Sequence, residues 1–387
     1  MTLFAARSLM LGALSLALTA CAGSTNRPAF TPHQSSGQER AADQSVRVDP
    51  VWQFSVNEKG IGGFKPVEPF GLTTTRGGMV VVAAYSGVVH GLHSVSGEER
   101  WQLDLKEVPS TPPTSSGDRV YLGVSDGRLL ALDARTGAVA WTTKLNHIVH
   151  GQPTVHNGVV YVQTSEEAVV AVDESTGEVR WTYRHPRVAE LEIQGGGRPT
   201  VLGEDIYVGF SDGSFYRLNQ SGKQVWVTDL SHGKRRMVDV DSTPVQYGKF
   251  IIAASHSGGL SAVHEDTGRV QWTIDRGGIT NPMLANGRLI VTTSSGVVLW
   301  IHPETGEIQQ ELELARPGLT SPMRFTEHTF VVGDSDRGAI VLDIDTPKLH
   351  ALFEATVGIS GAMAHHRDML FVVTNRGMVY GLKASLL

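Results

Sequence analysis

Short apolar runs, each bounded by turn residues, recur along the chain from about residue 50 to its end. Runs such as Val120–Leu122 and Ile206–Val208 consist of β-branched, aromatic and aliphatic residues, which favour strands. Many runs end at a glycine preceded by Ser, Thr or Asp, as at Ser86–Gly87 and Asp126–Gly127, and such pairs are typical of tight turns. The pattern therefore predicts an all-β chain of many short strands.

A tryptophan recurs in step with these turns. Trp101, Trp141 and Trp181 are 40 residues apart, and Trp226 and Trp272 continue the series. Each stands four residues after a turn glycine, namely Gly97, Gly137, Gly177, Gly222 and Gly268. The sixth copy keeps Gly306 but has Gln310 in place of the tryptophan, and Thr346–Pro347 is a degenerate seventh copy. Such self-similarity at a fixed period indicates a repeat architecture.

A second turn precedes each of these turns by nine or ten residues and occurs eight times. Its copies are Ser86–Gly87, Asp126–Gly127, Glu166–Glu167, Asp212–Gly213, Ser257–Gly258, Ser295–Gly296, Arg337–Gly338 and Arg376–Gly377. Each repeat then consists of four strands joined by turns, which is one blade of a β-propeller. Eight copies of the turn predict eight blades. A β-solenoid is the alternative fold, but its repeats are shorter.

The last repeat is incomplete, because the chain ends soon after Met378–Leu382 without a turn and a tryptophan strand. The missing strand is present at the other end, where Val51–Phe54 contains Trp52 but follows no repeat. We expect this segment to complete the last blade, since an open ring would expose two sheet edges. The predicted fold is an eight-bladed β-propeller of four-stranded antiparallel blades over residues 47–387, closed by an N-terminal strand.

Residues 1–20 contain one Arg, no acidic residue and an apolar run, as in a secretory signal peptide. The run ends at Leu18-Thr19-Ala20-Cys21, which resembles a bacterial lipoprotein signal with Cys21 as the acylated residue; a free cysteine in an ordinary signal peptide is the alternative. Residues 21–46 are polar and suit a flexible tether. The residue after the cysteine is Ala22, not the Asp that would suggest retention in the inner membrane. By resemblance to enterobacterial lipoprotein sorting, this favours the outer membrane. We therefore expect a lipid-anchored outer-membrane protein that faces the periplasm.

Composition excludes several classes of function. A net charge of −6 and a pI near 6.2 argue against a nucleic-acid-binding protein, which needs a basic face. The single cysteine excludes an internal disulfide, an iron–sulfur cluster and a thiolate zinc site. The 15 histidines include no H-E-x-x-H motif, and the sequence has no G-x-S-x-G elbow. We expect no catalytic residue, no metal and no cofactor.

The repeats also resemble a known superfamily. Ala131–Gly137 followed by Trp141, and Ala171–Asp173 followed by Trp181, resemble the blade repeat of quinoprotein dehydrogenases. Within that superfamily, Asp239–Pro244 resembles a blade segment of the BamB family, and Val331–Asp336 resembles another. These proteins are lipoprotein subunits of the outer-membrane β-barrel assembly machinery. The resemblance covers the signal, the tether and all eight blades, and it implies a non-catalytic scaffold that assists folding and insertion of outer-membrane β-barrels.

A quinone-dependent (PQQ-type) dehydrogenase is the alternative of a different class. Such enzymes often carry adjacent cysteines and calcium-binding carboxylates in the central funnel. The repeated acids of this chain stand at or beside turns, where Asp stabilises the local backbone: Asp126, Asp133, Asp173 and Asp212. Added quinone and calcium would raise the melting temperature of a true enzyme of this class. A periplasmic adaptor for another partner is a third hypothesis, which a pull-down from outer membranes would separate from the first.

Two neighbouring repeats contain long connections. Trp181 to Pro199 and Trp226 to Pro244 each span 18 residues, whereas the corresponding spans elsewhere are 10 to 12 residues. Insertions of this kind map to loops, often on a binding face. The first contains Leu191 and Ile193, and the second mixes both charges with apolar residues in Lys234-Arg235-Arg236-Met237-Val238-Asp239-Val240-Asp241. Apolar residues flanked by charges are typical of a protein interface; the alternative is that Leu191 and Ile193 pack inward.

The BamB resemblance implies which partner these loops bind. In that family the matching loops contact a periplasmic POTRA domain of BamA, the barrel-forming subunit. Leu191, Ile193 and Gln194 match positions of the first loop, and Asp239 and Asp241 match positions of the second. Gln194 stands where the family member compared has Arg, so a salt bridge would be reduced to a neutral hydrogen bond. The rest of the assembly complex and nascent outer-membrane proteins are further candidate partners, and the lipid anchor would contact the membrane.

Overall fold

The computed structural model describes residues 46–56, 71–186, 197–314, 317–355 and 357–386. Spatial contacts divide the chain into two units, Met1–Gln38 and Glu39–Leu387, and all of the described residues belong to the second. Across the described segments, no helix is long and apolar enough to cross a lipid bilayer. The described residues form strands and turns, as the alternation of apolar runs and turn residues predicts.

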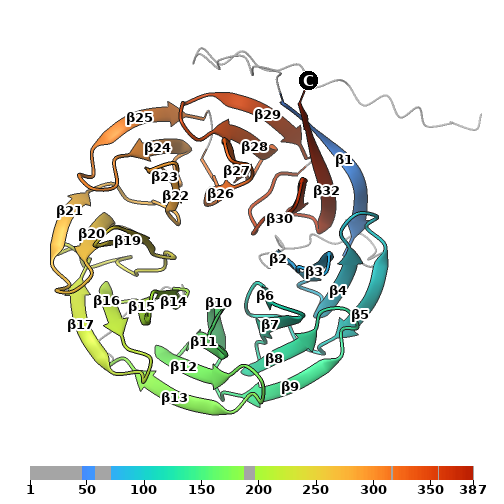
Figure 1. Cartoon of the computed structure of the whole chain (residues 1–387), viewed down its shortest axis with the longest axis horizontal. Coiled ribbons are helices and arrows are strands. Elements are labelled where there is room, and N and C mark those ends of the chain that lie inside the picture. The colour runs from blue at the N-terminus through green and yellow to red at the C-terminus, as the bar shows by residue number, and fades with distance from the viewer. Residues whose placement is uncertain (1–45, 57–70, 187–196, 315–316, 356, 387) are drawn as a thin grey trace, which may run out of the picture. The chain divides into compact units, whose positions relative to one another are not determined.

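The strands form eight four-stranded antiparallel sheets, which are arranged as the blades of a ring (Figure 1). Blade 1 consists of β2 (Leu72–Thr74), β3 (Met79–Ala83), β4 (Val88–His93) and β5 (Glu99–Asp104); blade 2 of β6 (Thr114–Ser116), β7 (Arg119–Gly123), β8 (Arg128–Asp133) and β9 (Val139–Lys144); blade 3 of β10 (Val149–His156), β11 (Val159–Thr164), β12 (Ala168–Asp173) and β13 (Val179–Arg184). Blade 4 consists of β14 (Thr200–Leu202), β15 (Asp205–Gly209), β16 (Ser214–Leu218) and β17 (Gln224–Asp229); blade 5 of β18 (Val245–Tyr247), β19 (Phe250–Ser255), β20 (Gly259–His264) and β21 (Val270–Ile274); blade 6 of β22 (Met283–Ala285), β23 (Arg288–Thr292), β24 (Val297–Ile301) and β25 (Ile308–Glu313). Blade 7 consists of β26 (Met323–Arg324), β27 (Thr329–Asp334), β28 (Gly338–Asp343) and β29 (Leu349–Glu354), and blade 8 of β30 (Ala364–His366), β31 (Met369–Val373), β32 (Met378–Leu386) and β1 (Val46–Ser55). The predicted eight-bladed propeller is confirmed.

The N-terminal strand closes the ring. β1 pairs with β32 in antiparallel register, with Trp52 opposite Gly381 and Phe54 opposite Val379. The blue N-terminal strand therefore lies beside the dark red C-terminal strand in Figure 1. Trp52 and Phe54 pack against a buried cluster that includes Phe371 of blade 8 and residues of blade 1. The predicted closure by the segment around Trp52 is thus confirmed.

The repeated tryptophan and glycine join six of the blades to the next blade. The indole nitrogen of Trp101 donates a hydrogen bond of 3.0 Å to the carbonyl of Ala134 in blade 2. The ring also covers Gly137, where a Cβ atom would lie 2.4 Å from it and where φ is +71°, so that only glycine fits. The same bond joins Trp52 to Ser94, Trp141 to Glu174, Trp181 to Gln220, Trp226 to Glu265 and Trp272 to Pro303.

Blade 6 makes this contact from a different strand. Gln310 occupies the tryptophan position of β25 and lies opposite Trp300 of β24. Trp300 is fully buried, and its indole nitrogen donates a hydrogen bond of 2.8 Å to the carbonyl of Ile344 in blade 7. The sequence pattern shows the lost tryptophan of this repeat, but only the strand register reveals its replacement.

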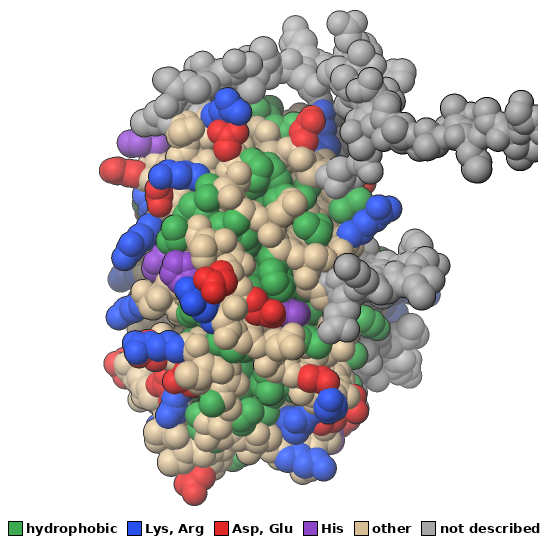
Figure 2. All heavy atoms as spheres, turned by 90° about the vertical axis from the view of Figure 1, so that its right-hand side faces the viewer, with side chains coloured by type: hydrophobic (Ala, Val, Ile, Leu, Met, Phe, Trp, Pro, Cys, Tyr) green, Lys and Arg blue, Asp and Glu red, His purple; other side chains and the backbone are tan. Residues whose placement is uncertain are grey.

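The core lies between adjacent blades, whereas the outer strands face solvent. One buried cluster joins Val81 and Val89 of blade 1 to Val120 and Leu122 of blade 2. The outer strands alternate, so that in β5 only the tryptophan side chain is fully buried. Figure 2, which views the rim on the right-hand side of Figure 1, shows acidic and basic side chains interspersed with apolar ones. Charges on outer strands protect such exposed edges from pairing with other chains.

Candidate partner-binding surface

The predicted site residues fall into two groups. Cys21, Leu191, Ile193 and Gln194 lie outside the described residues. Asp239 and Asp241 lie in the β17–β18 loop, residues 230–244, which connects blades 4 and 5. The structural description of the surface therefore concerns this second long loop.

Val240 anchors the β17–β18 loop in blade 4. Its side chain is 1% exposed, and its backbone nitrogen donates a hydrogen bond of 3.1 Å to the carbonyl of Phe210. A Cβ atom at Gly209 would lie 2.1 Å from the Val240 carbonyl oxygen, so the glycine permits this close approach. Val149 makes the corresponding contact with Gly123 of blade 2, where a Cβ atom would lie 2.6 Å from the Val149 Cβ. Asp239 and Asp241 thus flank a repeated structural position.

The rest of the loop is held by the turn between β19 and β20. The backbone nitrogen of Ser257 donates to the carbonyl of Met237 at 2.9 Å, and the Ser255 hydroxyl donates to the carbonyl of Val238 at 2.7 Å. The Ser257 hydroxyl donates to the carbonyl of Arg236 at 2.8 Å. The inserted residues are therefore fixed in place and present a preformed surface.

This surface combines cationic and apolar side chains. Arg235 and Arg236 are exposed, and neither forms an ion pair with another described residue. Met237 follows them with a side chain that is 51% exposed and a backbone φ of +52°. An exposed large apolar residue beside unpaired charges is typical of a protein interface, where the apolar part is buried and the charges determine orientation.

An acidic pair lies at the end of the same loop. Asp239 is only 5% exposed, whereas Asp241 is exposed, and together with His256 they offer three possible ligand atoms within 4.8 Å of one another. Although part of Asp241 is exposed to solvent, neighbouring atoms crowd its carboxyl group, and this desolvation, followed by the charge of Asp239, raises the pKa of Asp241. A divalent cation could bind three such ligands, and the same negative charge suits a guanidinium or ammonium group of a protein partner.

The raised pKa leads to a test of stability. At neutral pH the ionised Asp241 carboxylate destabilises the folded state, because the folded protein holds its proton more tightly than the unfolded chain does. We expect Asp241→Asn to melt at a higher temperature than the wild type at pH 7. This gain should shrink as the pH falls through the raised pKa and vanish below the ordinary aspartate range. Melting curves by circular dichroism across this pH range measure it.

Asp173→Asn is the control, for which we expect a change in melting temperature of the opposite sign. Hydrogen bonds from Ser175 and Arg180 hold the pKa of Asp173 well below the ordinary range, so its ionised form stabilises the fold. This variant should melt at a lower temperature than the wild type at pH 7. A melting temperature of Asp241→Asn equal to or below that of the wild type at neutral pH would contradict the assignment.

A buried polar cluster between blades 3 and 4 was not predicted from the sequence. Glu167 occupies a turn position that is glycine in most repeats, with φ of +52° and 8% exposure, and its carboxylate accepts a hydrogen bond of 3.1 Å from the backbone of Ser211. His185, at the end of blade 3, lies 3.0 Å from the Asp212 carboxylate and stacks on Phe210. Burial raises the pKa of Asp212, but hydrogen bonds from His185 and Ser214 outweigh it and lower the pKa. The cluster joins blades 3 and 4, and the Glu at a glycine position was its only signal in the sequence.

Comparison with known proteins places the chain in a family. The family profile described as "Outer membrane protein assembly factor BamB" matches residues 48–147 and 85–312, which together cover more than half of the chain. The outer membrane protein assembly factor BamB of Legionella pneumophila (strain Paris) is 25% identical over 202 residues, which are 50% of this chain and 52% of that protein. BamB of Salmonella typhimurium is 28% identical over 211 residues, or 50% of this chain and 51% of that protein. The chain thus spans about half the length of these relatives in the matched regions.

Solved structures agree on the fold. BamB from Moraxella catarrhalis superimposes with a TM-score of 0.75 and 22% identity, covering 87% of this chain and all of that one. The quinohemoprotein alcohol dehydrogenase from Comamonas testosteroni superimposes with a TM-score of 0.70 and 14% identity, over 87% of this chain and 76% of that one. At these identities the structures show a shared propeller, whereas the profile match identifies the family. The chain belongs to the BamB family of outer membrane protein assembly factors.

Proposed function

We propose that the protein is a non-catalytic scaffold of the outer-membrane β-barrel assembly machinery. It binds the periplasmic POTRA region of BamA and assists the folding and insertion of outer-membrane β-barrel proteins. The observation that carries the proposal, within the BamB family, is the β17–β18 loop, which presents exposed Met237 and an acidic pair on a rigid frame. Its neighbour along the ring, the β13–β14 loop, has the same length and contains the apolar candidates Leu191 and Ile193.

The two acids have different roles in this proposal. Asp241 is exposed and faces a cationic side chain of the partner directly. Asp239 is buried behind it and strengthens the negative potential without making the contact itself. Leu191 and Ile193 supply the apolar part of the interface, and Gln194 supplies a neutral hydrogen bond. Pairing of the exposed carboxylate with an Arg or Lys would relieve the unfavourable charge at the acidic pair.

The repeated acids support a scaffold rather than an enzyme. The Asp133 carboxylate accepts hydrogen bonds from the backbone nitrogens of Arg135 and Thr136 at 3.0 and 2.9 Å. The Asp173 carboxylate accepts the corresponding bonds from Ser175 and Thr176 at 2.9 and 3.0 Å. These carboxylates stabilise turns at the outer side of the blades, so their repetition has a structural cause.

A pull-down tests the proposal. The tagged full-length chain, expressed at native level and purified from detergent-solubilised outer membranes, should retain BamA through high-salt washes. Cells that lack the chain should contain less folded β-barrel protein in the outer membrane. An absence of BamA from the purified material, with the chain itself folded and at the membrane, would refute the proposal.

The anchor is a separate part of the proposal, motivated by Leu18-Thr19-Ala20-Cys21. Cys21→Ser should abolish labelling by radioactive palmitate and release the propeller into the soluble periplasmic fraction, because the acyl chains supply the membrane affinity. Fractionation in cells depleted of BamA removes retention through the partner. Unchanged membrane association of the variant in those cells would show that acylation is not the main anchor.

A further inference from the structure

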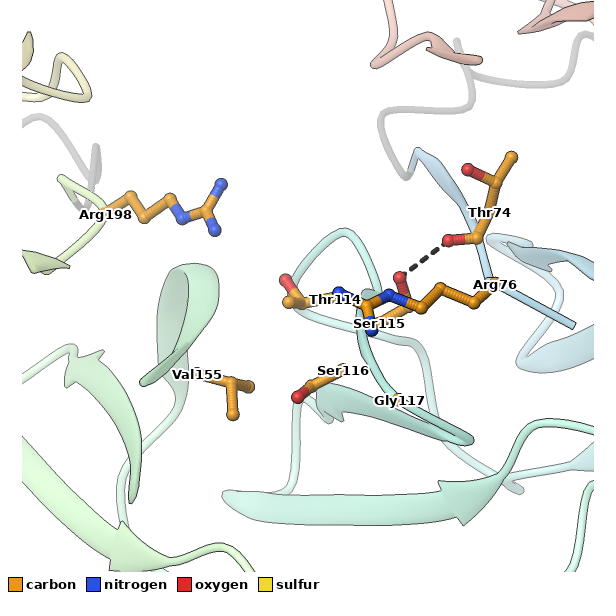
Figure 3. Close-up of a pocket in the computed structure, with 8 residues that line it drawn as sticks. All are labelled: Thr74, Arg76, Thr114, Ser115, Ser116, Gly117, Val155 and Arg198. Atoms are coloured by element: carbon orange, nitrogen blue, oxygen red, sulfur yellow. Dashed lines mark hydrogen bonds between the residues drawn. The ribbon is translucent and has the colours of Figure 1, made fainter. Parts of the chain in front are cut away.

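A polar cavity of about 300 Å³ lies beside the innermost strands of blades 1 to 3. It is lined by Thr74, Arg76, Val155, Arg198 and residues 114–117, which belong to the inner strands of blades 1 to 3, to their turns, and to the segment before β14. In Figure 3, Arg76 and Arg198 approach the space from opposite sides, with their guanidinium groups directed toward it. Two cationic groups from distant parts of the chain therefore meet in one cavity.

Arg198 is held in place by neutral partners. Its Nε donates a hydrogen bond of 2.8 Å to the Thr154 hydroxyl, and its Nη1 donates one of 3.0 Å to the Gln152 side-chain oxygen. Gln152 is itself fixed, because its amide nitrogen donates to the carbonyl of Pro113 at 2.9 Å. Among the described residues no carboxylate pairs with Arg198, and burial lowers its pKa. The guanidinium is thus oriented and partly desolvated, and no carboxylate of the described residues compensates its charge.

The opposite wall adds a second cation and hydroxyl groups. Arg76 lies in the turn between β2 and β3, and it forms no hydrogen bond or ion pair with another described residue. The Ser115 hydroxyl donates to the carbonyl of Thr74 at 2.7 Å, and the Thr114 hydroxyl donates to the carbonyl of Pro153 at 2.7 Å, so these side chains are fixed. The described lining residues include no acid. Within the described residues the cavity is therefore positive, and its donors for a ligand are the guanidinium groups, because both hydroxyl hydrogens are already used.

Several other arginines of the propeller do pair with carboxylates, as Arg180 does with Asp173 and Arg217 with Asp205. The chain as a whole carries a net charge of −6, so overall charge does not explain a cavity lined by two arginines that pair with no described carboxylate. Paired guanidinium groups bind planar or tetrahedral oxyanions with several parallel hydrogen bonds.

We propose that this cavity is a binding site for a small free dianion or polyanion bearing phosphate or carboxylate groups, held between Arg76 and Arg198. The volume admits a molecule of small-metabolite size, and the two cations match at least two negative charges. None of its lining residues is a proposed BamA contact residue, although Arg198 lies near the end of the β13–β14 loop.

Thermal shift and calorimetric titration of the full-length chain test the site. The probes are inorganic phosphate, diphosphate and citrate, each compared with sodium chloride at equal ionic strength. We expect at least one probe to raise the melting temperature saturably. Tighter binding of diphosphate assigns phosphate chemistry, and tighter binding of citrate assigns carboxylate chemistry. No saturable shift with any of the three probes would overturn the proposal.

Two variants establish which residues bind. Arg76→Ala and Arg198→Met should each weaken binding about tenfold or more, because each removes charge-assisted hydrogen bonds. Without a probe, Arg198→Met should melt no lower than the wild type, since it removes a desolvated, unpaired charge. Arg100→Ala, which changes an exposed arginine of β5, is the matched control and should bind normally. Binding unchanged in both cavity variants, or weakened equally in the control, would assign the anion to another place.

Discussion

A chain that lacks residues 1–56 will not form a stable propeller, whereas a chain that lacks residues 1–45 will keep the wild-type fold. The difference is β1, which pairs along its whole length with β32. The Trp52 indole nitrogen donates a hydrogen bond of 2.8 Å to the carbonyl of Ser94 in blade 1, and the ring lies 5.8 Å from that of Phe371 in blade 8. Without β1 the edge of β32 and the cluster between blades 8 and 1 become exposed to water.

The expected loss is large. Removal of a fully buried tryptophan costs roughly 3 to 5 kcal/mol of unfolding free energy. Trp52 is partly buried, but the longer deletion also removes the whole paired strand β1. Both truncations can be produced without a signal and compared by circular dichroism melting and gel filtration. The longer one should aggregate or melt far below the shorter one.

Trp52→Ala in the otherwise intact chain is the graded version of this experiment. It keeps the strand and its backbone pairing but removes the indole contacts with Ser94 and Gly97. Its unfolding free energy should therefore lie between those of the two truncations. Equal thermal stability of the two truncations would show that β1 is not required for closure.

The second prediction concerns the partner interface. We expect Leu191→Ala with Ile193→Ala, and separately Asp239→Asn with Asp241→Asn, to weaken association with BamA severely. Central interface contacts commonly contribute roughly 2 kcal/mol or more each, so the apolar pair should reduce affinity by more than about a hundredfold. The acidic pair, in which only Asp241 makes the contact, should reduce it by about thirtyfold or more. Asparagine keeps the size of the buried Asp239 side chain, so the second pair removes charge with little change in packing. Co-purification of BamA and surface plasmon resonance with isolated POTRA domains measure the loss.

Matched controls separate the interface from general effects. Val139→Ala with Val179→Ala removes two exposed apolar side chains from outer strands, and Glu304→Ala with Glu307→Ala removes two exposed carboxylates from a turn of blade 6. Both controls should bind BamA normally, and surface changes of this kind should alter stability by no more than about 0.5 kcal/mol. Normal association of both loop variants would refute the site, and a loss of folding would show that these residues are structural.

The fold could be predicted from the sequence to a large extent because its determinants are local. Five blades repeat a turn glycine and a tryptophan four residues later, and the structure shows that the tryptophan packs on the turn glycine of the next blade. Trp52 predicted ring closure because it is a copy of the repeated tryptophan that stands before the first repeat. The structure shows it bonded to blade 1 as the other copies are bonded to their next blades. The enlarged loops were also readable, because an insertion changes the spacing between repeated residues.

The candidate site could be predicted only in part. The spacing and the BamB resemblance singled out Asp239 and Asp241, but not that one is buried and the other exposed. That difference depends on how Val240 inserts over Gly209 of the preceding blade, a contact between residues 31 positions apart. Cys21, Leu191, Ile193 and Gln194 lie outside the described residues and stay predictions.

By itself, the sequence determined the number of blades, their four-stranded make-up and the closing strand, because strand period, turn residues and repeat length are properties of neighbouring residues. Only the tertiary structure decided which side chains meet across blades. Trp300 takes over a contact that Gln310 cannot make, and Arg76 and Arg198 converge on one cavity although 122 residues separate them. Ring closure sets these distances, and a contact between blades depends on the geometry of the whole ring rather than on the local pattern.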